Sequence, residues 1–148
     1  MSKVFPPTAL KVKMSTSNKT NNKIHEKMLD TILKKSANNQ NSISERIEEL
    51  DREWDTERIL ETNASIIILI SIALGILFGK WWFLLSALVA FYLLQHAIQG
   101  WCPPLPILRK LGIRTMSEIN TEKTVLKVLR GDFDNCKTDT VELIKAAE

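Results

Sequence analysis

The sequence predicts an all-α membrane protein built on a two-helix transmembrane hairpin flanked by cytoplasmic amphipathic helices. Charge is sorted along the chain: residues 64–101 carry one charged side chain, Lys80, whereas both flanking regions are rich in charge. A soluble domain distributes charged side chains over all its surface elements, so a gap of this width indicates contact with lipid. Within the gap, two apolar runs are separated by the sequence Gly-Lys-Trp-Trp.

The two apolar runs have the lengths of membrane helices. Residues 64–79 contain no charge and span about 24 Å as a helix, and residues 81–101 span about 31 Å. In one continuous helix Lys80 would lie near the bilayer centre, which costs roughly 2.5–3.5 kcal/mol. We therefore predict a hairpin over 64–101. Its interface anchors are Lys80, Trp81 and Trp82 at the turn and Trp101 at the opposite interface.

Basic residues predict the orientation of the hairpin. Its turn offers only Lys80, whereas several arginines and lysines flank its outer ends. Because such residues are retained on the cytoplasmic side, we expect both termini in the cytoplasm. The flanking residues are Arg46, Arg52, Arg58, Arg109, Lys110 and Arg114.

The region before the hairpin divides into two parts. Residues 1–42 hold eight lysines and two acidic residues, and we expect a largely disordered basic arm, with disorder over 1–22 and a linker over 37–42. Within it, residues 23–35 predict a short amphipathic helix that either rests on an anionic membrane surface or forms transiently in solution. Residues 43–63 predict a cytoplasmic amphipathic helix that runs directly into the membrane. The apolar faces consist of Ile24, Met28, Ile32 and Leu33 in the first helix, and Ile43, Ile47, Leu50 and Trp54 in the second.

Residues 102–148 predict a cytoplasmic helical tail. Prolines at 103, 104 and 106 are expected to end the second membrane helix. Thr115 and Glu118 form a capping box for a helix that ends before Gly131. We expect a further short helix over 138–147. The inward-facing residues of the capped helix are predicted to be Ile119, Leu126 and Leu129.

Small residues recur on both membrane helices, which allows helix backbones to approach closely in lipid. They either pack the hairpin onto itself or pair subunits. Because two helices bury little surface, we favour a homodimer. The stripes consist of Ser71, Gly75 and Gly79 on the first helix and Ser86, Ala90 and Ala97 on the second.

Gln95, His96 and Gln99 form the polar cluster of the second helix, and intramembrane polar groups are candidates for function. Their position close to Trp101 favours hydrogen bonding between subunits. His96 lacks a second ligand at suitable spacing, so we predict no metal and no cofactor.

Cys102 is the candidate thiol, and it either carries a sulfane sulfur or is a small residue in a turn. The C-terminal end of a helix raises a thiol pKa, although Arg109 and Lys110 could offset this if the loop folds back. Cys136 lies in a polar tail and is expected to be incidental.

One run of sequence, FYLLQHAIQGWCPPLPILRKLGIRT, resembles the end of the YgaP-like transmembrane domain, a family of bacterial inner-membrane proteins. The resemblance covers roughly 45–133. In some members the hairpin follows a rhodanese domain, but this chain has no Cys-Arg-x-Gly active loop, so sulfurtransferase activity does not carry over. The resemblance implies a bacterial inner-membrane location, a homodimer and a link to sulfur or thiol metabolism. The matching residues are Gly100, Trp101, Cys102 and Pro103, then Leu111, Gly112, Ile113 and Arg114.

No catalytic residue emerges, because the sequence has no phosphate-binding glycine loop, paired catalytic carboxylates or nucleophile triad. The basic arm lacks interleaved aromatics, which favours the lipid bilayer over nucleic acid. We therefore expect a non-enzymatic, homo-oligomeric anchor or scaffold that recruits a cytoplasmic partner through 43–60 and 116–130. The alternatives are a sulfur carrier acting through Cys102 and a small permease for a sulfur anion.

Overall fold

A computed structural model describes residues 6–133 and Leu143, and within these residues the secondary structure is helical with no strand. The helices form two compact units. The hairpin unit comprises the described residues of 1–21 and 54–115, and the head unit those of 22–53 and 116–148. The predicted all-α class is therefore confirmed over the described residues. Cys136 and most of the helix predicted over 138–147 lie outside them.

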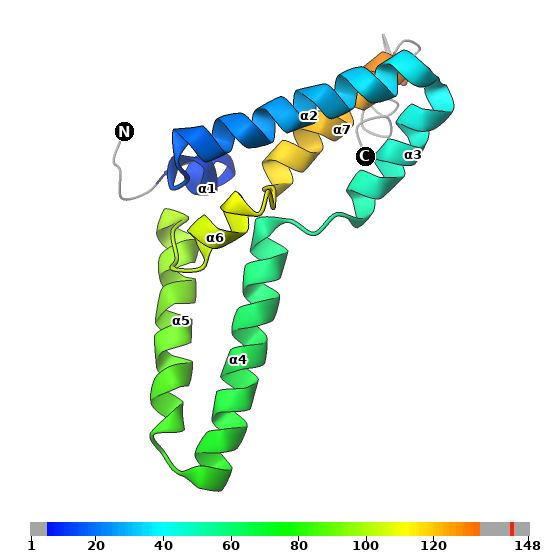
Figure 1. Cartoon of the computed structure of the whole chain (residues 1–148). Coiled ribbons are helices and arrows are strands. Elements are labelled where there is room, and N and C mark those ends of the chain that lie inside the picture. The colour runs from blue at the N-terminus through cyan, green and yellow to red at the C-terminus, as the bar shows by residue number, and fades with distance from the viewer. Residues whose placement is uncertain (1–5, 134–142, 144–148) are drawn as a thin grey trace. The chain divides into compact units, whose positions relative to one another are not determined.

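The hairpin unit is built on two antiparallel helices, α4 (Thr56–Phe78) and α5 (Trp82–Gln99), which lie side by side and are joined by a short turn (Figure 1). Their contact is formed by small residues. The hydroxyl oxygens of Ser71 and Ser86 lie 2.6 Å apart and share a hydrogen bond. At Gly75 a Cβ atom would lie 2.8 Å from Cζ of Phe83, so the missing side chain leaves room for the aromatic ring.

The head unit is a helical bundle made from chain segments on both sides of the hairpin. It comprises most of α2 (Asn18–Asn38), together with α3 (Gln40–Arg52) and α7 (Met116–Arg130). An ion pair joins α3 to α7, with Nε of Arg46 2.9 Å from Oε1 of the buried Glu122. The apolar core contains Met28, Ile32, Ile43, Ile47, Leu50, Ile119 and Leu126.

Three residues predicted on the apolar faces are exposed instead. Leu33 is 69% exposed, Leu129 is 50% exposed and Trp54 is 46% exposed. Trp54 lies beyond the end of α3, and its ring stacks under the guanidinium of Arg58 at 4.4 Å. Other residues of the predicted apolar faces fill the core of the head, so Leu33, Leu129 and Trp54 remain on the surface.

A break separates α3 from α4, whereas we predicted that the helix would run directly into the first membrane segment. The intervening residues 53–55 are not helical. Asp55 caps α4, because its side chain accepts the backbone N–H of Arg58 at 2.8 Å. Thr56 then donates both its N–H and its hydroxyl to the carbonyl of Arg114, at 2.8 and 2.9 Å. The Asp55 cap and the two hydrogen bonds from Thr56 to Arg114 explain why the helix is interrupted at residues 53–55.

The basic arm also differs from its prediction. Residues 8–21, called the strap below, contain a 3₁₀ turn (Thr8–Leu10), α1 (Lys11–Met14) and the start of α2, instead of the disorder expected for 1–22. The linker predicted over 37–42 is reduced to Asn39, which caps α3 by accepting the N–H of Ser42 at 2.9 Å. The strap is ordered because Val12 is buried against the hairpin with Leu60, Cys102 and Leu105.

The end of α5 is set by Gly100 rather than by the prolines. Gly100 adopts the left-handed conformation at φ 75°, and its N–H donates to the carbonyl of His96 at 2.8 Å. The prolines lie further along, and Pro106 is part of the first turn of α6 (Leu105–Lys110). As predicted, α7 ends immediately before Gly131.

We expect Gly100→Ala to destabilise the hairpin unit more than Gly112→Ala. Both glycines have positive φ, 75° and 88°, so either alanine is strained by roughly 1–2 kcal/mol. Only at Gly100 would the new Cβ meet backbone, 2.5 Å from the carbonyl carbon of Lys11, whereas Gly112 has nothing within 4 Å. Thermal unfolding in detergent and hydrogen exchange of α1 amides measure the difference. Equal losses of stability would contradict the close approach.

We expect Leu126→Ala to destabilise the head by about 2–5 kcal/mol, because its side chain is fully buried in the core. Leu129→Ala is the matched control on the same helix, and it should change the free energy of unfolding by less than about 0.5 kcal/mol. Chemical denaturation of the two variants, followed by circular dichroism, compares them. A loss at Leu129 as large as that at Leu126 would contradict the exposed position of Leu129 and favour the predicted face, on which both residues point inward.

Candidate functional site

The outer surface of the hairpin is apolar. Both α4 and α5 are long and apolar enough to cross a membrane, and few side chains of their most apolar stretches are buried within the chain. Ile66, Leu69 and Leu94, for example, are 49%, 67% and 60% exposed. The core helix of a soluble protein would bury most of these side chains. The hairpin instead presents them outward along both helices.

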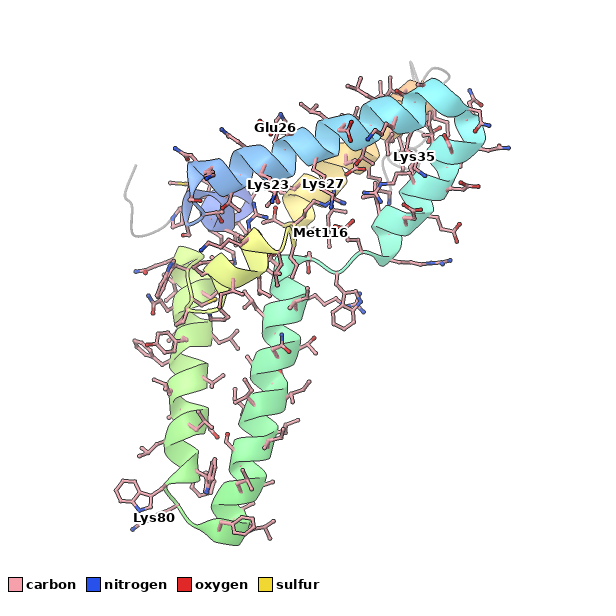
Figure 2. The ribbon with its side chains drawn as sticks, in the orientation of Figure 1. Lys23, Glu26, Lys27, Lys35, Lys80 and Met116 are labelled. Carbon is pink, nitrogen blue, oxygen red and sulfur yellow. The ribbon has the colours of Figure 1, made fainter. Side chains whose placement is uncertain are left out.

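The predicted interface anchors lie at the two ends of the hairpin. Lys80 is at the closed end, formed by the turn (Figure 2), and Trp81 and Trp82 follow it there. All three of these side chains are exposed. Trp101 follows the end of α5 and marks the open end, where it is also exposed. Lysine and tryptophan at these two levels suit the two interfaces of a bilayer.

The small-residue stripes serve different purposes. Ser71 and Gly75 are buried between α4 and α5, and Ser86 contacts Ser71, so these residues pack the hairpin onto itself. Gly79 lies in the turn. The remaining members, Ala90 and Ala97, are exposed on the outer surface of α5.

The strap lies across the open end of the hairpin and is fixed there by several contacts. The Lys11 backbone fills the space beside Gly100, and the Ser15 hydroxyl donates to the carbonyl of Gln99 at 3.2 Å. Arg109, whose side chain is almost fully buried, donates to Oγ1 of Thr16 at 3.2 Å and to Oδ1 of Asn21 at 3.1 Å. The sequence indicates Arg109 only as a basic residue of the membrane flank, because no local pattern provides a signal for this structural role.

The polar residues predicted to form a cluster on α5 do not contact one another through hydrogen bonds. His96 is buried, Gln95 is half-buried and Gln99 is exposed, and no hydrogen bond joins their side chains in the described part of the chain. Neither ring nitrogen of His96 has a hydrogen-bond partner among the described residues. The same holds for Oε2 of Glu57, at the start of α4. A permease path lined jointly by the three residues of the cluster gains no support from this arrangement.

Cys102 lies in the apolar cluster beneath the strap and is 4% exposed. Burial raises the pKa of the Cys102 thiol, and an interaction with the backbone N–H of Leu105 only partly offsets this. Arg109 is directed towards the strap and towards the carbonyl of Ile113, at 2.9 Å. A buried thiol with a raised pKa is protonated at neutral pH and is a poor nucleophile. The site therefore favours the packing role of Cys102 over the sulfur carrier.

Among the described residues, no cluster of histidine, cysteine or carboxylate side chains could hold a metal ion. Comparison of the chain with family models, curated proteins and solved structures finds no match. The class of protein is therefore defined by its own geometry: a helical chain with two helices that could span a membrane and a separate helical head.

We expect His96→Leu to stabilise the protein by about 1 kcal/mol, because the ring is buried with both nitrogens unpaired. His96→Gln is the control, because it keeps buried polar atoms and should bring no gain. Thermal unfolding of both variants in the same detergent measures the effect. Destabilisation by leucine together with unchanged stability of the glutamine variant would contradict a ring whose two nitrogens are unpaired.

Proposed function

We propose that this chain is a non-enzymatic membrane anchor whose hairpin crosses a bacterial inner membrane and holds a helical head on the cytoplasmic side. The proposal rests mainly on one observation, that helices from both sides of the hairpin form the head. Its α3 precedes the hairpin and its α7 follows it, yet both contribute to one core and share the Arg46–Glu122 ion pair. A head of this kind supports an even number of crossings, because an odd number would separate the two flanks across the membrane.

The surface of the hairpin supports the membrane location. Exposed apolar side chains cover α4 and α5, and the only charge between their apolar stretches is Lys80, in the turn. Lipid would cover an apolar surface that water would otherwise contact. The excess of basic residues at the open end supports a cytoplasmic head, because such residues are retained on that side.

Packing within the head reduces the apolar surface that a cytoplasmic partner could contact. Within 43–60 and 116–130, through which we expect a partner to bind, five apolar residues pack with α2 in the core of the head: Ile43, Ile47, Leu50, Ile119 and Leu126. Besides Met116 at its start, α7 leaves three apolar side chains exposed on one face of its C-terminal half, Val125, Val128 and Leu129. As a scaffold, the protein would offer this face of α7 to a cytoplasmic partner, while the hairpin fixes the head at the membrane.

Membership of the YgaP-like family and pairing as a homodimer are part of the same proposal. The family motif includes Gly100 and Gly112, and both have the positive φ that favours glycine, so the motif has a conformational reason in this chain. Homodimerisation would use the outer surface of α5, where Ala90 and Ala97 allow close helix approach.

Single-cysteine labelling tests the location and the orientation together. In a Cys102→Ala, Cys136→Ser background, we expect Lys80→Cys to react with a membrane-impermeant maleimide in right-side-out vesicles only. Lys110→Cys is the matched reporter at the open end and should react in inside-out vesicles only, because both native lysines are exposed. Reaction of both positions from one side without detergent would refute a spanning hairpin, and the reverse pattern would refute the orientation.

A further inference from the structure

Exposed cationic side chains occur on each of the segments that meet at the open end of the hairpin. Lys13 and Lys19 come from the strap, Arg58 from the first turns of α4 and Lys110 from the end of α6. These four residues are called the collar below. Lys13 and Lys19 are distant in sequence from the hairpin, and the folded strap brings them to it. The closed end, in contrast, carries Lys80 alone.

The collar is held in place by well-defined contacts. Val12, directly before Lys13, is 2% exposed and packs with Leu60 of α4 and Leu105 of α6. The carbonyl of Lys13 itself accepts a hydrogen bond from Nδ2 of Asn21, at 2.9 Å. The backbone that carries the strap lysines is therefore fixed to the hairpin, so their position does not depend on a flexible tail.

Acidic residues at the same end neutralise the collar only in part. Asp55 is buried as the cap of α4, and Oε2 of Glu57 is also buried, which leaves Glu61 as the exposed acid of this turn. The exposed charge around the open end is therefore predominantly positive. Trp101 lies beside it, because this residue follows Gly100, against which Lys11 packs.

We propose that the collar binds the phosphate headgroups of anionic phospholipids in the leaflet that surrounds the open end of the hairpin. The inference rests on the proposed function, since it requires the hairpin to span the membrane. Lysine and arginine beside a tryptophan, at the margin of a long apolar surface, match the level of lipid phosphates. The position of the collar at this margin favours lipid over a soluble anionic partner.

Tryptophan quenching by brominated lipids tests the proposal. The full chain is reconstituted with Trp101 as its sole tryptophan, the other three being replaced by Phe, and in a second form with Trp82 as its sole tryptophan. Each form is placed in phosphatidylcholine vesicles that contain the same fraction of brominated phosphatidylglycerol or brominated phosphatidylcholine. We expect brominated phosphatidylglycerol to quench Trp101 roughly twofold more strongly, and Trp82 to show no such preference. High salt should reduce the preference at Trp101.

Two charge-matched triple variants identify the residues responsible. Lys13→Gln, Lys19→Gln and Lys110→Gln together should abolish the preference at Trp101. Lys23→Gln, Lys27→Gln and Lys34→Gln remove the same charge from exposed positions of α2 in the head, and should preserve it. All six lysines are exposed, so circular dichroism and thermal unfolding should match the parent chain.

The outcomes separate the collar from the membrane anchor. Equal quenching of Trp101 by the two lipids, or loss of the preference in both triple variants, overturns the collar while the hairpin still spans the bilayer. A preference of the same size at Trp82 also overturns it. Absence of quenching at both tryptophans by either lipid instead overturns the proposed function, and the collar with it.

Discussion

The hairpin unit depends on one close approach, in which the backbone of Lys11 packs against Gly100 at the end of α5. Any side chain at position 100 would overlap the Lys11 backbone, and the left-handed φ of Gly100 is the turn that ends the helix. This contact brings Val12 over the apolar cluster that contains Cys102, and it places the strap across the open end. The burial of the Cys102 thiol and the placement of the strap lysines both follow from it.

The two units are stabilised by different means. In the head, apolar side chains from three helices fill a common core, as in a small soluble bundle. In the hairpin unit the buried apolar cluster of Val12, Leu60, Cys102 and Leu105 is confined to the open end, and most large apolar side chains of α4 and α5 are exposed. These helices meet instead through Ser71, Gly75 and Ser86, and contacts of this kind suit a lipid environment, where the hydrophobic effect gives no attraction between helices.

The sequence predicted the hairpin well because hydropathy and a single charge determine it. Because a lysine at the centre of a bilayer is costly, the sequence predicts a turn at Lys80, and the structure has its turn at 79–81. The strap was not predictable in this way. Its composition is polar, and its order comes from one buried apolar residue, Val12, and from hydrogen bonds to Arg109 and Gln99 that lie more than eighty positions away. Disorder was the natural expectation from composition alone.

The break between α3 and α4 illustrates the same limit. Helical periodicity continues through residues 43–60, so local propensity favoured one helix. The long-range bonds from Thr56 to the carbonyl of Arg114 favour the break, and Asp55 then supplies the cap.

For the candidate site, the sequence identified Cys102 and His96 as unusual residues. The burial of both residues decides what they can do and is a property of the tertiary structure, and Cys102 in particular is packed with Val12 of the strap.

The order of the chain constrains how the protein assembles. The head requires contacts between residues 76 positions apart, as in Arg46 with Glu122, and the whole hairpin lies between these two residues. A core of this kind closes only after α7 has been synthesised, because α3 and α2 alone lack Ile119 and Leu126. If the hairpin inserts as it emerges, its two helices return the chain to the side from which it entered. Insertion then shortens the spatial distance between α3 and α7, and so lowers the entropic cost of forming the head.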